Sequence, residues 1–128
     1  MKKILFIDDD PDIVAVTKFI LEDANFLVLA ASSAEEGINI LERDLPDLIL
    51  LDLFLPKMQG WELSKQLKKN VRYKHIPIIL FTANAGIINK TVYEMGGDDF
   101  IIKPYEADVL VEKISERLNQ SSQGSASQ

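Results

Sequence analysis

The chain has 128 residues, no cysteine and a net charge of −6, and its 47% hydrophobic and 27% charged content is typical of one globular domain with a full-sized core. This composition excludes disulfides, thiol catalysis and thiolate metal sites, and the acidic balance argues against a nucleic-acid-binding surface. Residues 1–7 are too short an apolar stretch for a signal peptide, and no stretch has the length of a transmembrane helix, so we expect a cytoplasmic protein without membrane insertion.

A short apolar run opens the chain. Residues 4–7 have the length of a strand, and they end at Asp8-Asp9-Asp10. Pro11 favours the first position of a helix with Asp10 as its N-cap, and apolar residues at helical spacing continue this helix to about residue 23. The first strand is therefore followed by three carboxylates, of which the helix cap needs only one.

A second strand and helix follow. Residues 26–30 predict the strand, and a capping box of Ser33 and Glu36 opens a helix to about residue 43. Gly37 inside this helix destabilises it by about 1 kcal/mol relative to alanine, so its presence indicates close packing against a sheet.

The third apolar run has no polar residue from 48 to 51, as in parallel strands that are covered by helices on both faces. The run stops at Asp52, and the chain then turns into a helix after Gly60, whose apolar stripe includes Trp61. Because open α/β sheets bind ligands at the carboxyl ends of their strands, Asp52 is the first candidate for a functional residue.

The alternation continues in the last third of the chain. Residues 76–81 predict a strand that ends in Thr82, and a weak helical pattern follows over residues 85–95. Residues 100–102 predict the last strand, which ends at Lys103-Pro104.

The final helix is predicted to end near Asn119, with Leu110, Ile114 and Leu118 at four-residue spacing. From residue 120 the chain consists of Ser, Gln, Gly and Ala, a composition too polar to pack. We therefore expect one domain over residues 1–119 and a disordered tail or linker remnant over residues 120–128.

Strand and helix alternate five times, which predicts a doubly wound α/β domain with a five-stranded parallel sheet and helices on both faces. Four of the five strands end, at the same edge, in residues able to do chemistry: Asp8 with Asp9, Asp52, Thr82 and Lys103. One or two of these have ordinary explanations, since threonine is common in strands and a lysine can snorkel from an apolar surface. Four together indicate a single site.

The charges of this site indicate its chemistry. Three neighbouring carboxylates repel one another unless a cation neutralises them, and an all-oxygen ligand set favours Mg²⁺. A divalent ion beside a carboxylate, an ammonium group and a hydroxyl suits phosphoryl transfer, in which an aspartate can itself act as the nucleophile. Asp52, at the centre of the edge, is the candidate nucleophile.

Together these segments resemble the receiver domain of two-component response regulators, including the chemotaxis regulators, over almost the whole chain up to the tail. The matching segments are ILFIDDD (4–10), LLDL (50–53), LPKM (55–58) with Gly60, FTA (81–83), and GDDF (97–100) before Lys103-Pro104. The individual segments are unspecific, whereas their order and separation are specific.

The resemblance implies a flavodoxin-like strand order 2-1-3-4-5 and a signalling module that catalyses its own phosphorylation and slow dephosphorylation. By this resemblance Asp52 is the phosphoacceptor, and Mg²⁺ is bound by Asp8, Asp9, Asp52 and the backbone carbonyl of Phe54. Thr82 and Lys103 are implied to sense the phosphoryl group and Phe100 to act as an aromatic switch. The Lys103–Pro104 bond is implied to be cis.

The implied partners are a histidine kinase or histidine phosphotransferase and an unidentified downstream protein, without direct nucleic-acid binding. The chain is expected to be a monomer or a weak phosphorylation-dependent dimer. Two residues depart from the family pattern: Gln59 replaces the usual Asp or Asn before the third helix, and the bulky Phe54 stands where access of hydrolytic water is influenced.

Other functions fit the residues less well. A haloacid-dehalogenase-type phosphohydrolase needs a second Asp two residues after the nucleophile, where this chain has Phe54. A flavodoxin-like cofactor binder needs a phosphate loop rich in Ser, Thr or Gly after the first strand, and this chain has no such loop there. A pseudo-receiver interaction domain does not need the full set of acids, so the presence of all of them argues against this class. His75 is expected at the surface, and the basic run over residues 65–74 is expected to be a solvated face, with a partner surface as the alternative.

Overall fold

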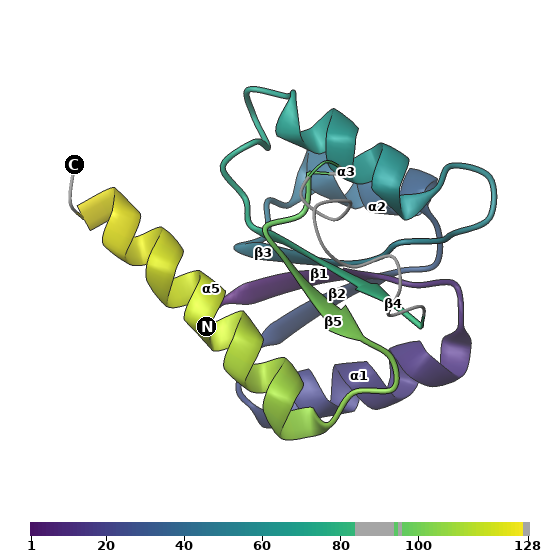
Figure 1. Ribbon diagram of the computed structural model, residues 1–128, viewed down its shortest axis with the longest axis vertical. Coiled ribbons are helices and arrows are strands. Elements are labelled where there is room, and N and C mark those ends of the chain that lie inside the picture. The colour runs from purple at the N-terminus through teal and green to yellow at the C-terminus, as the bar shows by residue number, and fades with distance from the viewer. Residues whose placement is uncertain (84–93, 95, 127–128) are drawn as a thin grey trace.

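The computed structural model describes residues 1–83, 94 and 96–126. Five parallel strands form one sheet in the order β2-β1-β3-β4-β5, which confirms the predicted order and fold class (Figure 1). The strands are β1 (Lys3–Ile7), β2 (Leu27–Ala31), β3 (Leu48–Asp52), β4 (Ile78–Thr82) and β5 (Asp99–Ile102).

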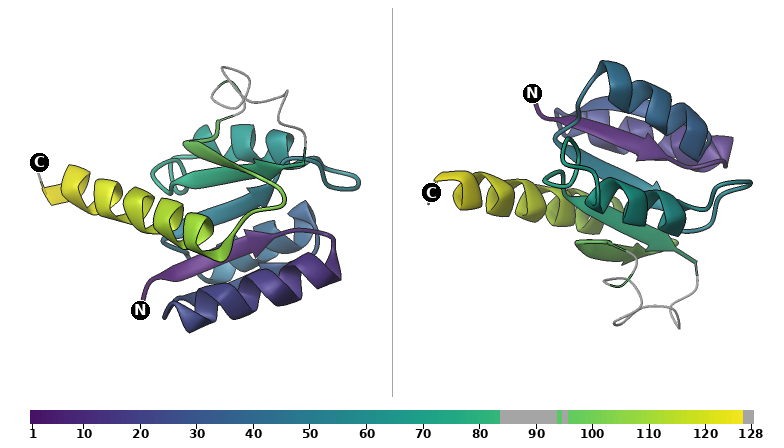
Figure 2. Two further views of the ribbon diagram at one scale, coloured as in Figure 1. Left: turned by 60° about the horizontal axis from the view of Figure 1, so that its bottom comes forward. Right: turned by 90° about the horizontal axis from the view of Figure 1, so that it is seen from above.

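Helices cover both faces of the sheet. They are α1 (Pro11–Asp23), α2 (Ala34–Arg43), α3 (Gly60–Lys68) and α5 (Ala107–Ala126). Helices α1 and α5 lie on one face and α2 and α3 on the other (Figures 1 and 2). The helix predicted over residues 85–95 lies outside the described residues, apart from Glu94.

The central strand β3 explains why the chain forms two cores. All five of its residues are buried, and successive side chains point to opposite faces. Leu48 and Leu50 therefore join the cluster under α1 and α5, whereas Ile49 and Leu51 join the cluster under α2 and α3. An uninterrupted apolar run is what a strand covered on both faces requires.

Helix α1 begins as predicted, because the Asp10 carboxylate accepts hydrogen bonds from the backbone N–H groups of Asp12 and Ile13. Of its apolar residues, Ile13, Val14 and Ile20 are partly buried against the cluster under α1 and α5. Thr17 and Leu21 are the buried residues, and Val16 is 60% exposed. The hydroxyl of the buried Thr17 is hydrogen-bonded to the hydroxyl of Tyr105, which allows a polar residue to occupy this position.

Helix α2 also follows the prediction in its main features. The Ser33 side chain accepts a hydrogen bond from Glu36 N, while the Glu36 carboxylate bonds Ser32 rather than Ser33. A Cβ at Gly37 would lie 2.5 Å from Cδ1 of Ile7, so any larger residue in this part of α2 would force the Ile7 side chain to shift.

Helix α5 packs through Leu110, Ile114 and Leu118, as predicted. It continues to Ala126, beyond the end expected near Asn119, and its last turns project past the sheet (Figure 1). Once a helix has formed, each further residue that joins it gains one backbone hydrogen bond. A polar segment can therefore continue the helix although it packs against no core. None of the helices in the described part of the chain is both long enough and apolar enough to cross a membrane.

Candidate functional site

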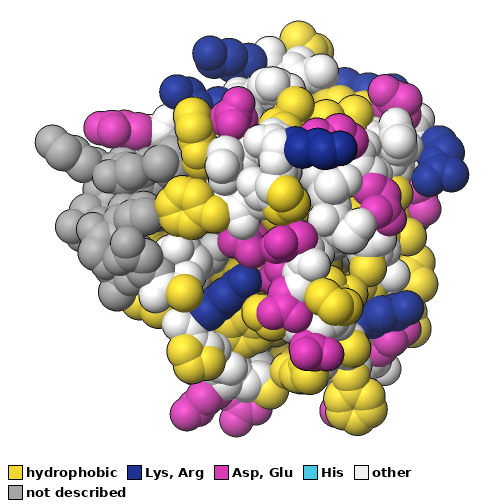
Figure 3. All heavy atoms as spheres, turned by 90° about the vertical axis from the view of Figure 1, so that its right-hand side faces the viewer, with side chains coloured by type: hydrophobic (Ala, Val, Ile, Leu, Met, Phe, Trp, Pro, Cys, Tyr) yellow, Lys and Arg dark blue, Asp and Glu magenta, His cyan; other side chains and the backbone are white. Residues whose placement is uncertain are grey.

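The predicted site residues meet at the edge of the sheet where the strands end. Acidic side chains gather near the middle of this face, among apolar ones (Figure 3). Asp8 is fully buried, Asp52 is 7% exposed and Thr82 is 3% exposed. These residues come from the ends of three adjacent strands, β1, β3 and β4, so the sheet itself brings them together.

Lys103 joins two of the carboxylates. Its Nζ donates to Asp8 Oδ2 at 3.0 Å and to Asp52 Oδ2 at 3.1 Å, and it lies 4.6 Å from the centre of the Phe81 ring. The Lys103–Pro104 peptide bond is cis, as the family resemblance implies.

Burial and charge act in opposite directions on these groups. Burial raises the pKa of Asp52, and the neighbouring Lys103 offsets only part of this rise. Burial opposes the charged form of Lys103, but its hydrogen bonds and charge interactions with Asp8 and Asp52 outweigh this effect and raise the pKa of the ammonium group. Lys103 is therefore held as a cation between two acids.

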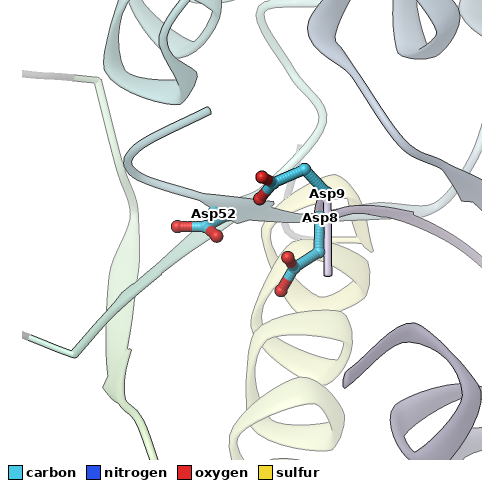
Figure 4. A group of neighbouring side chains, drawn as sticks. All are labelled: Asp8, Asp9 and Asp52. Atoms are coloured by element: carbon cyan, nitrogen blue, oxygen red, sulfur yellow. The ribbon is translucent and has the colours of Figure 1, made fainter. Parts of the chain in front are cut away.

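Asp9 completes an acidic cluster at the surface. It is exposed, and one carboxylate oxygen each from Asp8, Asp9 and Asp52 lie within 4.8 Å of one another. The three side chains come from the ends of two neighbouring strands (Figure 4). Asp8 Oδ1 accepts a hydrogen bond from Asp10 N at 2.9 Å, which orients the buried carboxylate. The cluster offers only oxygen ligands, the set preferred by a hard divalent cation.

The loop after β3 is held closely against Asp52. Phe54 N donates to Asp52 Oδ1 at 3.2 Å, and a Cβ at Gly60 would overlap the Asp52 backbone carbonyl, so α3 can begin here only with glycine. Gln59 Oε1 accepts from Leu55 N within the loop. The Phe54 side chain is 47% exposed.

Thr82 and Phe100 lie on neighbouring strands. Thr82 O accepts a hydrogen bond from Lys103 N at 2.8 Å, which ties the end of β4 to the segment that carries the lysine. Phe100 pairs with Leu80 in the sheet register, two residues before Thr82, and it is half-buried. Lys113 Nζ lies 5.1 Å from the centre of the Phe100 ring. The two residues thus lie on adjacent strands, close to each other along the sheet.

Tyr105 supports the site and was not foreseen from the sequence. Its hydroxyl forms a 2.5 Å hydrogen bond with the hydroxyl of the buried Thr17, and its ring packs edge-on against Phe81 at 6.3 Å. Phe81 in turn lies beneath the Lys103 ammonium group. The sequence signal for this hydrogen bond is the polar Thr17 at a buried position of α1.

A second group of charges joins β5 to α5. Asp99 accepts hydrogen bonds from Lys113 Nζ at 3.1 Å and from Arg117 Nε at 3.2 Å. Burial opposes ionisation of Asp99, but the Phe100 N–H and the two cations together lower the pKa of its carboxyl group. These contacts fix α5 against the strand that carries Phe100.

Comparison with known proteins agrees with this geometry. The sequence profile of the response regulator receiver domain matches residues 4–115. The chain belongs to this family.

Relatives of this receiver domain include regulators of transcription. The chain is 36% identical over 121 residues to the alkaline phosphatase synthesis transcriptional regulatory protein PhoP of Bacillus subtilis, covering 94% of this chain and 50% of PhoP. It is 34% identical over 122 residues to the transcriptional regulatory protein CpxR of Escherichia coli, covering 94% and 51%. The chain thus spans about half the length of the curated relatives that it matches.

Solved structures share the fold over the whole receiver domain. A CheY-like response regulator receiver domain protein from Methanospirillum hungatei is 34% identical, with a TM-score of 0.88, and the match covers 97% of this chain and 98% of that protein. The family consists of signalling modules that carry an acidic pocket at the carboxyl edge of the sheet, where this chain has Asp8, Asp9 and Asp52.

Proposed function

We propose that this receiver domain is the phosphoacceptor module of a cytoplasmic two-component phosphorelay, and that Asp52 takes the phosphoryl group from a phosphohistidine donor. The observation that carries the proposal is the position of the Lys103 ammonium group, which bridges Asp8 and Asp52 at the edge of the sheet. A buried carboxylate with a cation fixed beside it is suited to accept a phosphoryl group whose charge must be neutralised.

The acidic cluster fits Mg²⁺. One carboxylate oxygen each from Asp8, Asp9 and Asp52 lie within 4.8 Å of one another, and such an all-oxygen set would hold a hard divalent cation. We assign these carboxylates and the backbone carbonyl of Phe54 as the protein ligands. When bound, the ion neutralises charge on the oxygens of the transferring phosphoryl group.

The transfer uses few groups of the protein. An Asp52 carboxylate oxygen attacks phosphorus, the new O–P bond forms as the donor's N–P bond breaks, and the electron pair of that bond returns to the imidazole nitrogen. Lys103 stabilises the phosphoryl oxygens, as an ammonium group fixed in advance does in other phosphoryl transfers. The histidine kinase or histidine phosphotransferase supplies the phosphohistidine, and slow hydrolysis of the acyl phosphate resets the module.

The signal leaves the site through Thr82 and Phe100. The phosphoryl group adds acceptor oxygens that the Thr82 hydroxyl can bond and that Lys103 can pair with. An inward shift of Thr82 opens space that the half-buried Phe100 ring fills, which changes the face formed by β5, α5 and the segment over residues 85–95, where an unidentified downstream protein or a second copy binds. Residues 85–95 themselves lie outside the described residues, apart from Glu94.

This coupling predicts that Thr82→Ala leaves Asp52 phosphorylatable but uncouples it from the distant face. Two or three charge-assisted hydrogen bonds of about 1.5–3 kcal/mol each are enough for the roughly 5.5 kcal/mol that a nearly complete two-state shift requires. Amide NMR of wild type and variant with a beryllofluoride mimic measures the response. Equal shifts on α5 in both proteins contradict this route.

Intact-mass analysis after incubation with acetyl phosphate and Mg²⁺ tests the phosphoacceptor. We expect one added phosphoryl group on the wild type and none on Asp52→Asn. Label that persists in the variant, or that forms equally well in excess chelator, refutes the proposal. We further propose that residues 1–119 form the functional unit, so that removal of residues 120–128 leaves the extent of phosphorylation unchanged.

A further inference from the structure

The basic run over residues 65–74 has no part in the phosphoacceptor site. It occupies the end of α3 and the loop before β4, at the amino ends of the strands. Because β4 has five residues, its two ends are about 13 Å apart. The basic run therefore lies at the opposite edge of the sheet from Asp52. His75, at the end of the run, is exposed, as predicted.

A polar hollow of about 260 Å³ lies in this region. Lys68, Lys74 and His75 line it from one side, and Arg117 and Gln120 of α5 line it from the other. Three cationic side chains, from α3, the loop that follows it and α5, therefore line one small hollow in a chain whose net charge is −6.

The only carboxylate that lines the hollow, among the described residues, is Asp98, and it is already neutralised. Asp98 Oδ2 lies 2.7 Å from Lys68 Nζ and also accepts from Ile78 N at 2.7 Å. Lys68 Nζ additionally donates to Ile76 O at 2.9 Å, so this lysine forms the fixed base of the hollow.

The remaining donors face the hollow with unused capacity. Within the described part of the chain, the Lys74 ammonium group and the His75 ring make no hydrogen bond or ion pair. Arg117 uses Nε for Asp99 and Nη1 for Gln120, which leaves Nη2 to donate to a ligand. A guanidinium edge with a nearby ammonium group is the arrangement that binds phosphate oxygens through charge-assisted hydrogen bonds.

We propose that this hollow binds the phosphate group of a small phosphorylated metabolite, through Lys74, Arg117 and His75. The site goes beyond the proposed phosphoacceptor function and does not depend on Asp52. The size of the hollow favours a monophosphate or diphosphate group, and the acidic balance of the whole chain disfavours a long polyanion.

The test is an amide NMR titration of the full chain with inorganic pyrophosphate, at constant ionic strength and in the presence of chelator. We expect saturable shifts at Lys74, His75 and Asp98. Lys74→Glu should weaken the affinity about tenfold or more, since it removes one charge-assisted contact and adds a repulsive one. Lys2→Glu is the matched control, because Lys2 is also exposed and the two variants have the same net charge.

Shifts that grow without saturation, or an equal loss of affinity in both variants, overturn the proposal because they indicate screening by ions in general. Shifts confined to Asp8, Asp52 and Lys103 also overturn it, since pyrophosphate then binds at the phosphoacceptor edge. Saturable binding of an oligoglutamate peptide, without saturable binding of pyrophosphate, assigns the surface to an acidic protein segment instead. Saturation at the hollow in Asp52→Asn separates this result from the fate of the phosphoacceptor proposal.

Discussion

Replacing Lys103 by methionine removes the only charge that the described structure places between Asp8 and Asp52. Methionine keeps most of the volume of the lysine stem, so packing against Phe81 changes little. The Asp8 side chain is fully buried, and that of Asp52 is 11% exposed, so water can replace the lost ammonium group only in part.

The size of the effect follows from these contacts. Removing one partner of a buried ion pair destabilises a protein by about 3–5 kcal/mol, a large part of the roughly 5–15 kcal/mol that stabilises a typical domain. Mg²⁺ should return part of this loss, because it binds the same carboxylates only in the folded state. A concentration of ten times the dissociation constant contributes about 1.4 kcal/mol, and a hundred times about 2.7 kcal/mol.

Urea unfolding near neutral pH, with and without Mg²⁺, measures both effects. Lys113→Met is the matched control, since this lysine is 31% exposed and its pair with Asp99 is worth about 1 kcal/mol or less. Adding Asp52→Asn to Lys103→Met should recover stability without metal, because one of the two facing carboxylates is gone. The reasoning is wrong if Lys103→Met unfolds at the wild-type urea concentration without metal, or if Mg²⁺ stabilises it no more than it stabilises Lys113→Met.

Three further substitutions test separate parts of the site. Asp9→Ala should abolish the rise of the melting temperature with Mg²⁺ concentration, and a retained rise shows that the exposed carboxylate is not a ligand. Phe54→Asn should shorten the lifetime of the acyl phosphate, because we expect the half-exposed ring to shield it from water. The measurement is the rate at which the phosphorylated wild type and variant lose their phosphoryl group, and an equal or slower rate in the variant counts against the prediction. Asp99→Asn should destabilise the domain by about 1–3 kcal/mol near neutral pH, measured by urea unfolding. Because folding lowers the pKa of Asp99, the stability that its carboxylate contributes is fully present above the ordinary pKa of 3.8 and is lost as the pH falls through the lower folded pKa. The free energies of unfolding of the two proteins should therefore converge in acid. A difference that does not depend on pH refutes the ion-pair explanation.

The strands were predictable because their signal is local. The run that contains Leu50 has no polar residue, and only a strand covered on both faces can bury such a run completely. Once the strands were parallel, their carboxyl ends had to share one edge, so the meeting of Asp8, Asp52 and Lys103 followed from topology before any distance was known.

The side-chain contacts across long sequence separations were not predictable in this way. Thr17 and Tyr105 are 88 residues apart, and no periodic pattern in the sequence indicates that these two residues are in contact. Val16 fits a helical apolar stripe as well as Leu21 does, yet it is exposed, because the angle at which α1 meets the sheet decides which side of the stripe is covered. The sequence also predicts an end of the last helix near Asn119, whereas α5 extends to Ala126. A polar composition indicates that a segment packs against no core, but it does not exclude that the segment continues an existing helix.

Because β3 is hydrogen-bonded to β1 on one side and to β4 on the other, its amide protons are shielded from solvent by backbone on both edges and by helices on both faces. Such amides exchange with deuterium mainly when the whole domain unfolds, whereas amides near chain ends and loops exchange through local opening. The slowest exchange should therefore fall on residues 49–51, immediately before Asp52. A deuterium label there reads the global free energy of unfolding directly, and it can follow metal binding or phosphorylation at the neighbouring carboxylate without any denaturant.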